Sequence, residues 1–274
     1  MHINCKGKLT DLSSPKVMGI LNITPDSFYD GNTLKNDKDI LLRAEKMLKE
    51  GATFIDVGGY SSRPNAKHIS ENEELQRVIP VIELLNKKFP NRFISIDSFR
   101  SKVVDEAIQA GACIVNDISA GSIDANMFKT IAKLQIPYII MHMQGTPQTM
   151  QKTPTYHNII KEIIYYFSEK IHQLRVLGVN DIIIDVGFGF GKTLPQNYEL
   201  LNNLALFKNL EVPILTGISR KSMLYKLLNT SSDRALNATT VANTIALLNG
   251  SNILRVHDVK EAQEAIQIVR ALKT

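Results

Sequence analysis

The chain has 274 residues, of which 44% are apolar and 22% charged, and its net charge is +5. That is enough apolar sequence for one sizeable core, while the positive residues are too dispersed, with too few aromatics between them, to predict a nucleic-acid groove. The basic excess favours either an anionic small ligand or simply a basic surface. No run of about 18 apolar residues predicts a membrane span, and residues 1–16 lack the apolar segment of a secretory signal.

The two cysteines, Cys5 and Cys113, show no spacing typical of a disulfide framework or a zinc site. This usage suits a reducing compartment. We therefore expect a cytoplasmic protein that binds neither membrane nor nucleic acid.

Apolar runs of strand length alternate along the chain with segments of helical period. The strand candidates are residues 17–21, 54–58, 93–97, 113–117, 138–143, 182–187, 213–217 and 253–257. Apolar stripes of three intervening helices are formed by Ile40, Leu41, Ala44, Met47 and Leu48, by Leu75, Val78, Ile79, Ile82 and Leu85, and by Ile159, Ile160, Ile163, Ile164, Phe167 and Ile171. Eight such units without a linker predict an α/β fold, a (β/α)8 TIM barrel, as one domain over residues 1–274. A doubly wound open sheet is the structural alternative, because periodicity does not report closure.

Polar residues stand at or near the ends of these strands. They are Asn22, Asp56, Asp97, Asn116, His142, Asp185, and Arg255 with His257. Parallel barrels place catalytic groups at the carboxyl ends of their strands, whereas a polar side chain in the middle of a buried strand would carry a desolvation cost. The pattern predicts an enzyme rim.

Two long connections follow the first two predicted strands, over residues 22–39 and 58–70. Both are rich in Pro, Gly, Ser and Asn and lack a helical stripe. Loops of this length in a compact barrel are usually lids or binding loops, although a tolerated insertion is the alternative.

Arg255 and His257 are two residues apart on a strand, so their side chains point to the same side. A guanidinium and an imidazole together make an anion clamp. Barrels often hold phosphate with the loops after strands seven and eight, where this pair and the segment 219–222 fall. We therefore expect an anion here, with a structural pair as the alternative.

Asp97, Asp185 and Asn116 end three predicted strands, and Lys221 follows a fourth. Two carboxylates and an amide facing a lysine suit a flat heterocycle with amino and carbonyl edges. A structural ion pair with Lys221 or Arg255 is the alternative. Asp56 is less informative and could serve only to orient the loop that follows it.

The glycine-rich segment 187–193 fits neither a Walker phosphate loop nor a dinucleotide fingerprint, because Val186 and Lys192 stand where glycines are required. We interpret it as a turn whose glycines let a flat ligand approach, with Phe190 as a stacking wall. His68, His157 and His172 are expected on the surface, and no zinc-binding spacing is present.

These segments together resemble the dihydropteroate synthases, a pterin-binding family. The resemblance rests on Met18 to Phe28 with Asp30 and Gly31, Asp56 to Gly59, Ser61 to Pro64, Ile96 to Ser98, Asn116 to Ile118, Met141 to Met143, Asp185 to Gly191, Ser219 to Ser222 and Arg255 to His257. It implies a (β/α)8 barrel, usually a homodimer. It also implies that p-aminobenzoate is joined to 6-hydroxymethyl-7,8-dihydropterin diphosphate, with release of diphosphate.

The resemblance also implies roles for individual residues. The pterin edge would bond to Asp97, Asn116, Asp185 and Lys221, with Arg255 stacked along its plane and Met141 and Gly217 as further contacts. The diphosphate would be held by Asn22, Ser62, Arg63, Arg255 and His257, and Mg²⁺ by the diphosphate with Asn22 as its protein ligand. Asp30 would support the metal shell and the cationic pterin intermediate. The p-aminobenzoate pocket would comprise Phe28, Ser61, Ser62, Pro64, Phe190, Lys221 and Ser222.

The second loop departs from the family pattern, since Tyr60 replaces the usual acidic residue and Asn65 the usual glycine; Asn32 replaces a glycine of the first loop. We expect the chemistry to survive, with a change in affinity for p-aminobenzoate or its sulfonamide mimics. Two other functions stay open. A methyltetrahydrofolate-binding methyltransferase would not need Arg63 or the Arg255 and His257 clamp, and a non-catalytic pterin-binding barrel would release no diphosphate.

Overall fold

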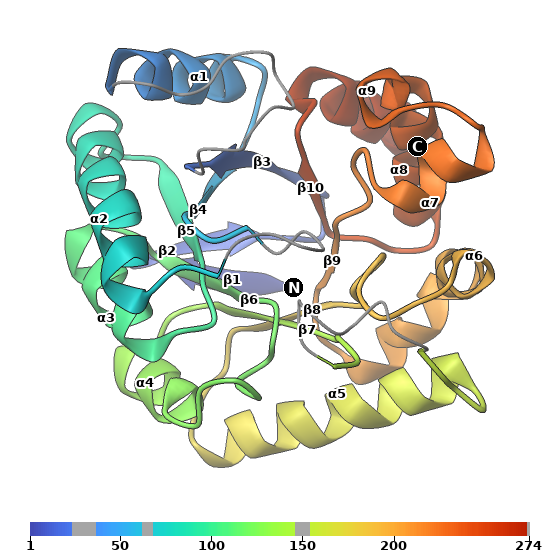
Figure 1. Cartoon of the computed structure of the whole chain (residues 1–274), viewed down its shortest axis with the longest axis horizontal. Helices are drawn as coiled ribbons and strands as arrows, with labels where there is room; N and C mark the ends of the chain where they lie inside the picture. The colour runs from blue at the N-terminus through green and yellow to red at the C-terminus, as the bar shows by residue number, and fades with distance from the viewer. Residues whose placement is uncertain (24–36, 62–67, 146–153, 273–274) are drawn as a thin grey trace.

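The computed structural model describes residues 1–23, 37–61, 68–145 and 154–272, and eight parallel strands close into a barrel (Figure 1). Around the barrel the strands follow the order β10, β3, β4, β5, β6, β7, β8, β9. Their bounds are β3 Lys16–Asn22, β4 Phe54–Gly58, β5 Phe93–Asp97, β6 Ile114–Asp117, β7 Tyr138–Met141, β8 Ile182–Asp185, β9 Ile214–Thr216 and β10 Ile253–Val256. All eight predicted strands are confirmed to within two residues at each end, and closure excludes the open sheet.

Helices surround the barrel and cover its outer face (Figure 1). They are α1 Asp37–Lys49, α2 Glu71–Lys88, α3 Ser101–Ala110, α4 Met127–Leu134, α5 Ile159–Val176, α6 Leu194–Asn202, α7 Ser222–Leu227, α8 Leu236–Leu248 and α9 Val259–Ala271, with short 3₁₀ turns η2 Leu204–Leu210 and η3 Ser232–Arg234. The three apolar stripes belong to α1, α2 and α5 and pack onto the strands. None of the described helices is both long and apolar enough to cross a lipid bilayer.

Local signals fix where individual helices start. Ser70 caps α2, because its hydroxyl accepts a hydrogen bond from the Glu73 backbone N–H. Thr193 and Gln196 form a reciprocal capping box at the start of α6. That box ends the glycine-rich turn after β8 at a defined residue.

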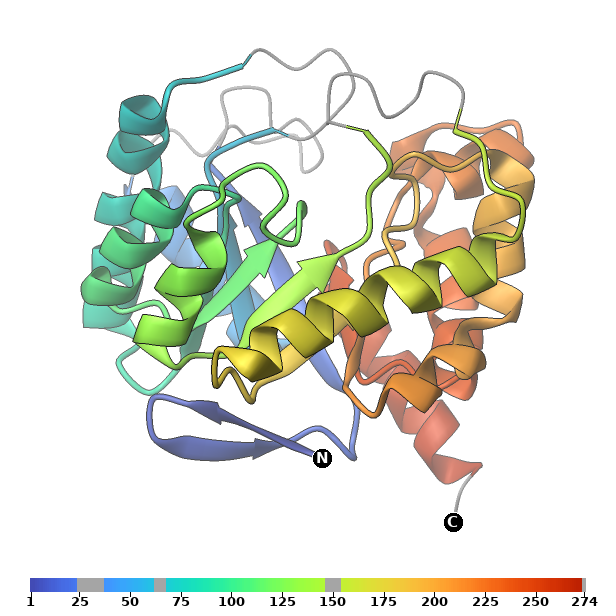
Figure 2. The same ribbon diagram turned by 90° about the horizontal axis from the view of Figure 1, so that it is seen from below.

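An N-terminal hairpin, which we did not predict, covers the amino-terminal end of the barrel (Figure 2). Its strands are β1 His2–Cys5 and β2 Lys8–Asp11, joined by Lys6 and Gly7 with positive φ. Ile3 and Cys5 pack against residues at the strand starts, among them Cys113. Both cysteines are free and buried. The carboxyl ends of the strands lie at the opposite end of the barrel, which we call the mouth.

Candidate active site at the barrel mouth

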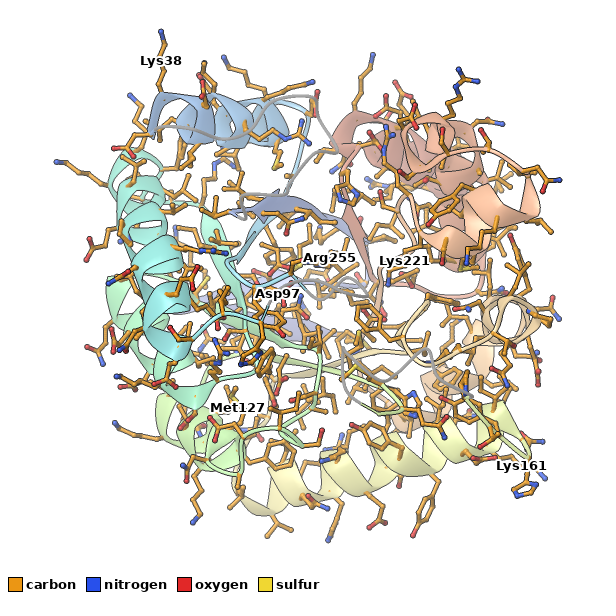
Figure 3. The ribbon with its side chains drawn as sticks, viewed as in Figure 1. Lys38, Asp97, Met127, Lys161, Lys221 and Arg255 are labelled. Carbon is orange, nitrogen blue, oxygen red and sulfur yellow. The ribbon has the colours of Figure 1, made fainter. Side chains whose placement is uncertain are left out.

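Three of the predicted site residues converge from distant strands. Asp97, Lys221 and Arg255 lie near the middle of the ring of helices, whereas Lys38 and Lys161 point outward at the periphery (Figure 3). The parallel register sets Gly58 beside Asp97, and Asp97 beside Asn116. Neighbouring strand ends therefore deliver their polar side chains to one place.

Arg255 links two carboxylates across the mouth. Its Nε lies 2.6 Å from Asp56 Oδ2, and its Nη2 lies 2.7 Å from Asp97 Oδ2. Asn116 Nδ2 also donates to Asp56 Oδ2, at 2.9 Å. The structural ion pair that we held as an alternative for Asp97 is therefore present. We expected Asp56 to be less informative and at most to orient the loop after it, but this buried carboxylate accepts hydrogen bonds from both Arg255 and Asn116.

Burial sets the protonation behaviour of this group. It raises the pKa of Asp97 to about 7, although the Arg255 charge opposes the shift. Burial also disfavours the charged guanidinium, but the carboxylates of Asp56 and Asp97 outweigh it and leave the Arg255 pKa raised. Arg255 therefore keeps its charge at all working pH values.

A second group forms where β8 and β9 end. Asp185 Oδ1 accepts from the Gly187 N–H at 2.8 Å, and the Lys221 ammonium donates to the Phe188 carbonyl. A Cβ atom added to Gly217 would lie 3.6 Å from Asp185 Oδ2 and 3.9 Å from Lys221 Nζ. Both charged groups therefore lie next to Gly217. Burial raises the pKa of Asp185 and lowers that of Lys221 to about 8, and the attraction between the two charges opposes both shifts.

His257 is held by Ser219, a contact that we did not predict. Ser219 Oγ lies 3.0 Å from His257 Nδ1 and accepts from the His257 backbone N–H at 3.2 Å. Burial, reinforced by the Arg255 charge, lowers the pKa of His257 to about 3. The imidazole is therefore neutral, so it can bind an anion by donating a hydrogen bond but not through a positive charge.

The segment 219–222 divides its side chains between two tasks. Arg220 adopts a φ of 55° and makes a bidentate pair with Asp258, both distances being 2.9 Å. Lys221 instead faces Asp185, and Ser222 opens α7 half-buried. Lys221 therefore faces the mouth, whereas Arg220 joins the loop after β9 to the loop after β10.

An apolar wall borders the polar groups. Met141 packs with Phe99 and Ile118, and the partly buried rings of Tyr60 and Phe190 join this cluster. The Lys221 ammonium lies 4.6 Å from the centroid of the Phe190 ring. These contacts place Phe190 and Met141 at the mouth, as expected. That either residue binds the ligand stays a prediction.

Tyr60 occupies the position where an acidic residue was expected, and its surroundings explain how the site does without one. Its ring meets Phe99 edge-on, with 5.0 Å between centroids, and the Arg100 guanidinium lies 5.6 Å from its centroid. Arg100 is already paired with the buried carboxylate of Glu74 and donates to the Ile69 carbonyl. The Tyr60 ring therefore lies beside a cation that is already paired with a carboxylate.

His142 does not join the mouth. Its ring packs edge-on against Tyr166 of α5, with 4.9 Å between centroids, and its Nδ1 lies 3.0 Å from Lys192 Nζ. The glycine-rich turn packs here too, because a side chain at Gly187 would begin 2.0 Å from the His142 carbonyl oxygen. Gly187 has a φ of 71°. Our expectation that these glycines admit a ligand was wrong for Gly187, which packs instead against the protein backbone.

Several predicted residues lie outside the described part of the chain: Phe28, Asp30, Asn32, Ser62, Arg63, Pro64 and Asn65. Asn22 is described, and its Oδ1 lies 3.4 Å from where a side chain at Gly58 would begin. Within the described residues, no three His, Cys, Asp or Glu side chains gather as a metal site. His68, His157 and His172 are exposed, as predicted.

Comparisons with known proteins agree with this arrangement. The model of the family described as "Pterin binding enzyme" matches residues 18–257. The chain is 44% identical to the dihydropteroate synthase of Escherichia coli K12 over 273 residues, which cover 99% of this chain and 96% of that protein. The chain belongs to the dihydropteroate synthase family.

Solved structures of this family superpose closely. The Yersinia pestis dihydropteroate synthase in a sulfonamide drug complex matches with a TM-score of 0.95 and 42% identity, covering 100% of this chain and 99% of that one. The Xanthomonas albilineans dihydropteroate synthase with 4-aminobenzoic acid matches with a TM-score of 0.92 and 34% identity, covering 100% and 98%. The barrel is therefore that of the dihydropteroate synthases throughout.

Proposed function

We propose that this chain joins p-aminobenzoate to 6-hydroxymethyl-7,8-dihydropterin diphosphate, which yields 7,8-dihydropteroate and diphosphate in folate biosynthesis. The observation that carries the proposal is the arrangement of Arg255 between Asp56 and Asp97, with Asp185 and Lys221 facing the same mouth. Carboxylates for the amino edge of a pterin and cations for a diphosphate are thereby present together.

The pterin is expected to bind through its edge. Asp97 and Asp185 would accept from its N–H groups, and Lys221 would donate to its carbonyl side. Asn116 gives its N–H to Asp56, which fixes the direction of its carbonyl oxygen as a further acceptor. Arg255, held flat by its two carboxylates, would stack along the ring.

The diphosphate is expected at Arg255 and His257, with Ser62 and Arg63 of the second loop as predicted partners. The neutral His257 supplies an N–H at a fixed angle, because Ser219 holds its other nitrogen. Asn22 on the rim would contribute the protein oxygen for Mg²⁺, which suits an ion that takes few protein ligands and several phosphate oxygens. Mg²⁺, when bound, would neutralise charge on the leaving diphosphate. Asp30 keeps its predicted supporting role.

The chemistry requires no nucleophilic side chain. The bond between the pterin methylene carbon and the diphosphate oxygen breaks, and the amine lone pair of p-aminobenzoate forms the new carbon–nitrogen bond with loss of one proton. Positive charge that develops on the pterin faces Asp97 and Asp185, while negative charge on the diphosphate faces Arg255. The arylamine would lie against Phe190, Lys221 and Ser222, with Phe28, Ser61 and Pro64 as predicted neighbours.

A homodimer is part of the proposal. Val241, Ile245 and Leu248 form one stripe on α8 and are 53%, 39% and 51% exposed, and Leu227 and Leu228 are exposed at the end of α7, a helix that contacts α8. Exposed apolar surface of this kind is typical of protein interfaces, and a symmetric dimer would cover it on both copies. A cytoplasmic location is also proposed, since the two buried thiols are free.

The test is diphosphate release by the purified protein, with dihydropterin diphosphate, Mg²⁺ and p-aminobenzoate each omitted in turn. Release that requires the arylamine is expected for the synthase. Asp185→Asn should then abolish it, and Arg255→Ala should abolish it while also lowering the free energy of unfolding, because Asp56 and Asp97 lose their cation. Pterin binding without any release would instead favour a methyltransferase or a silent binder.

A further inference from the structure

Lys192 is a buried amine to which the proposed mechanism gives no task. Burial lowers its pKa to about 7, although the Asp185 charge opposes the shift. Lys192 is only 4% exposed, which is as little as many residues of the apolar core. Its ammonium contacts His142 Nδ1 at 3.0 Å, the His142 carbonyl at 3.2 Å and the Phe190 carbonyl at 2.9 Å. Within the described residues, no carboxylate forms an ion pair with it. Burying an ammonium without such a partner is costly, so its three contacts call for an explanation.

These contacts join two loops of the barrel mouth. His142 follows β7, and Phe190 lies in the turn after β8, so the lysine fastens the turn to the neighbouring strand end. The same turn places the Gly187 N–H that donates to Asp185 at 2.8 Å. Gly187 itself packs against the His142 backbone with no space for a side chain. The position of the turn thus determines both the orientation of Asp185 and the place of the Phe190 ring.

Other contacts anchor the far side of this turn. Tyr156 donates to the Gly191 carbonyl at 2.9 Å, and Asn197 accepts from the Gly189 N–H at 2.6 Å. Neither hydrogen bond involves His142 or Phe190, although the Tyr156 and His142 rings lie 6.0 Å apart between centroids. Among the side chains of the described residues, Lys192 alone makes hydrogen bonds to both His142 and Phe190.

We propose that Lys192 is a positioning residue for the pterin: it clamps the β8 turn to His142 and thereby sets the placement of Asp185 and Phe190. It does not touch the reacting atoms. The role rests on the proposed function, because the pterin is the ligand that Asp185 would bind. The clamp should therefore govern pterin affinity through Asp185 and arylamine affinity through Phe190, more than the rate of the chemical step.

The test compares Lys192→Met, which keeps the length and apolar body but has no donor, with the unaltered protein. Titration calorimetry with 6-hydroxymethylpterin, an oxidised pterin without a leaving group, measures binding independently of turnover. We expect the dissociation constant to rise roughly tenfold, because the turn that holds Asp185 loses its hydrogen bonds to His142. In turnover assays the KM values for the pterin diphosphate and for p-aminobenzoate should both rise, while kcat changes less than about threefold.

Tyr156→Phe is the matched control, because it removes one anchor of the same turn without affecting the Lys192 contacts. It should leave pterin affinity within about threefold of the unaltered protein. Lys192→Gln keeps two N–H donors and should restore part of the lost affinity; it also replaces the Met variant if that variant does not fold. Unchanged pterin affinity in both Lys192 variants, or an equal loss in Tyr156→Phe, would overturn the proposal. If the unaltered protein binds pterin but releases no diphosphate, the proposed reaction fails while this binding test still stands.

Discussion

Arg255 Nε lies 2.6 Å from Asp56 Oδ2, and Asp56 is completely buried. Removing one partner of a buried ion pair leaves the other charge without full compensation, which typically costs about 3 to 5 kcal/mol. Asp56→Asn should therefore lower the free energy of unfolding by roughly this amount, toward the lower end because Arg255 keeps Asp97. Urea denaturation measures the change.

Asp97→Asn is the contrasting variant, because the Asp97 side chain is 21% exposed and is proposed to bind the pterin. It should destabilise the fold less than Asp56→Asn and weaken pterin binding more. Equal stability losses in the two variants would show that Asp97 supports Arg255 as much as the buried Asp56 does.

The pH profile should depend on Lys221. Burial lowers its pKa to about 8, so the ammonium is present below that pH and is lost as the pH rises through it. The value of kcat/KM for the pterin diphosphate, which reports groups of the free enzyme, should fall above about pH 8. In Lys221→Arg the cation persists at high pH, and this alkaline decline should move out of the measured range. A decline that stays at the same pH in the Arg variant would assign it to another group.

His257 should not contribute an acidic limb to the same profile. Its pKa is lowered to about 3, so its imidazole stays neutral between pH 5 and 8. Ser219→Ala removes the contact to Nδ1 and should reduce kcat/KM by about fivefold, the equivalent of one neutral hydrogen bond, at every pH in that range. A loss confined to the acidic side would contradict a neutral His257.

The sequence predicted the barrel because its strands and its polar strand ends are local signals. The apolar run 182–187, for example, contains the acidic residue Asp185, so both can be recognised without knowing how the rest of the chain folds. The N-terminal hairpin was not predicted, because its two strands have four residues each and few apolar side chains. The Lys6 and Gly7 turn between them was its only strong signal.

The tasks of two residues could not be predicted from the sequence for a different reason. Asp56 lies inside its strand, and its carboxylate meets Arg255 and Asn116 across the closed barrel, from strands that do not neighbour β4. Lys192 reads as part of a glycine-rich turn, and its environment comes from His142, 50 positions away in the chain. In both cases the information is in contacts between distant segments, which periodicity and motif spacing do not contain.

Tyr60 should influence the arylamine side of the site. Its ring belongs to the cluster that contains Phe190, and its hydroxyl lies 3.2 Å from His68 Nδ1. Tyr60→Leu removes the edge-on and cation contacts with Phe99 and Arg100 and should raise the KM for p-aminobenzoate and change sulfonamide inhibition by about threefold to tenfold. Tyr60→Phe keeps the ring and should differ little from the unaltered protein. Inhibition curves for the three proteins that coincide would remove Tyr60 from the arylamine site.

The apolar patch on α7 and α8 should control assembly. Ile245 lies in the middle of the stripe from Val241 to Leu248, so Ile245→Lys places a charge in the centre of the proposed interface, where burial of an unpaired charge is unfavourable. Light scattering should give a dimer for the unaltered protein and a monomer for this variant. Ile268→Lys is the control, because Ile268 is also an exposed isoleucine, at 63%, but belongs to a different helix, α9. A dimer that survives Ile245→Lys but dissociates in Ile268→Lys would place the interface on α9 instead.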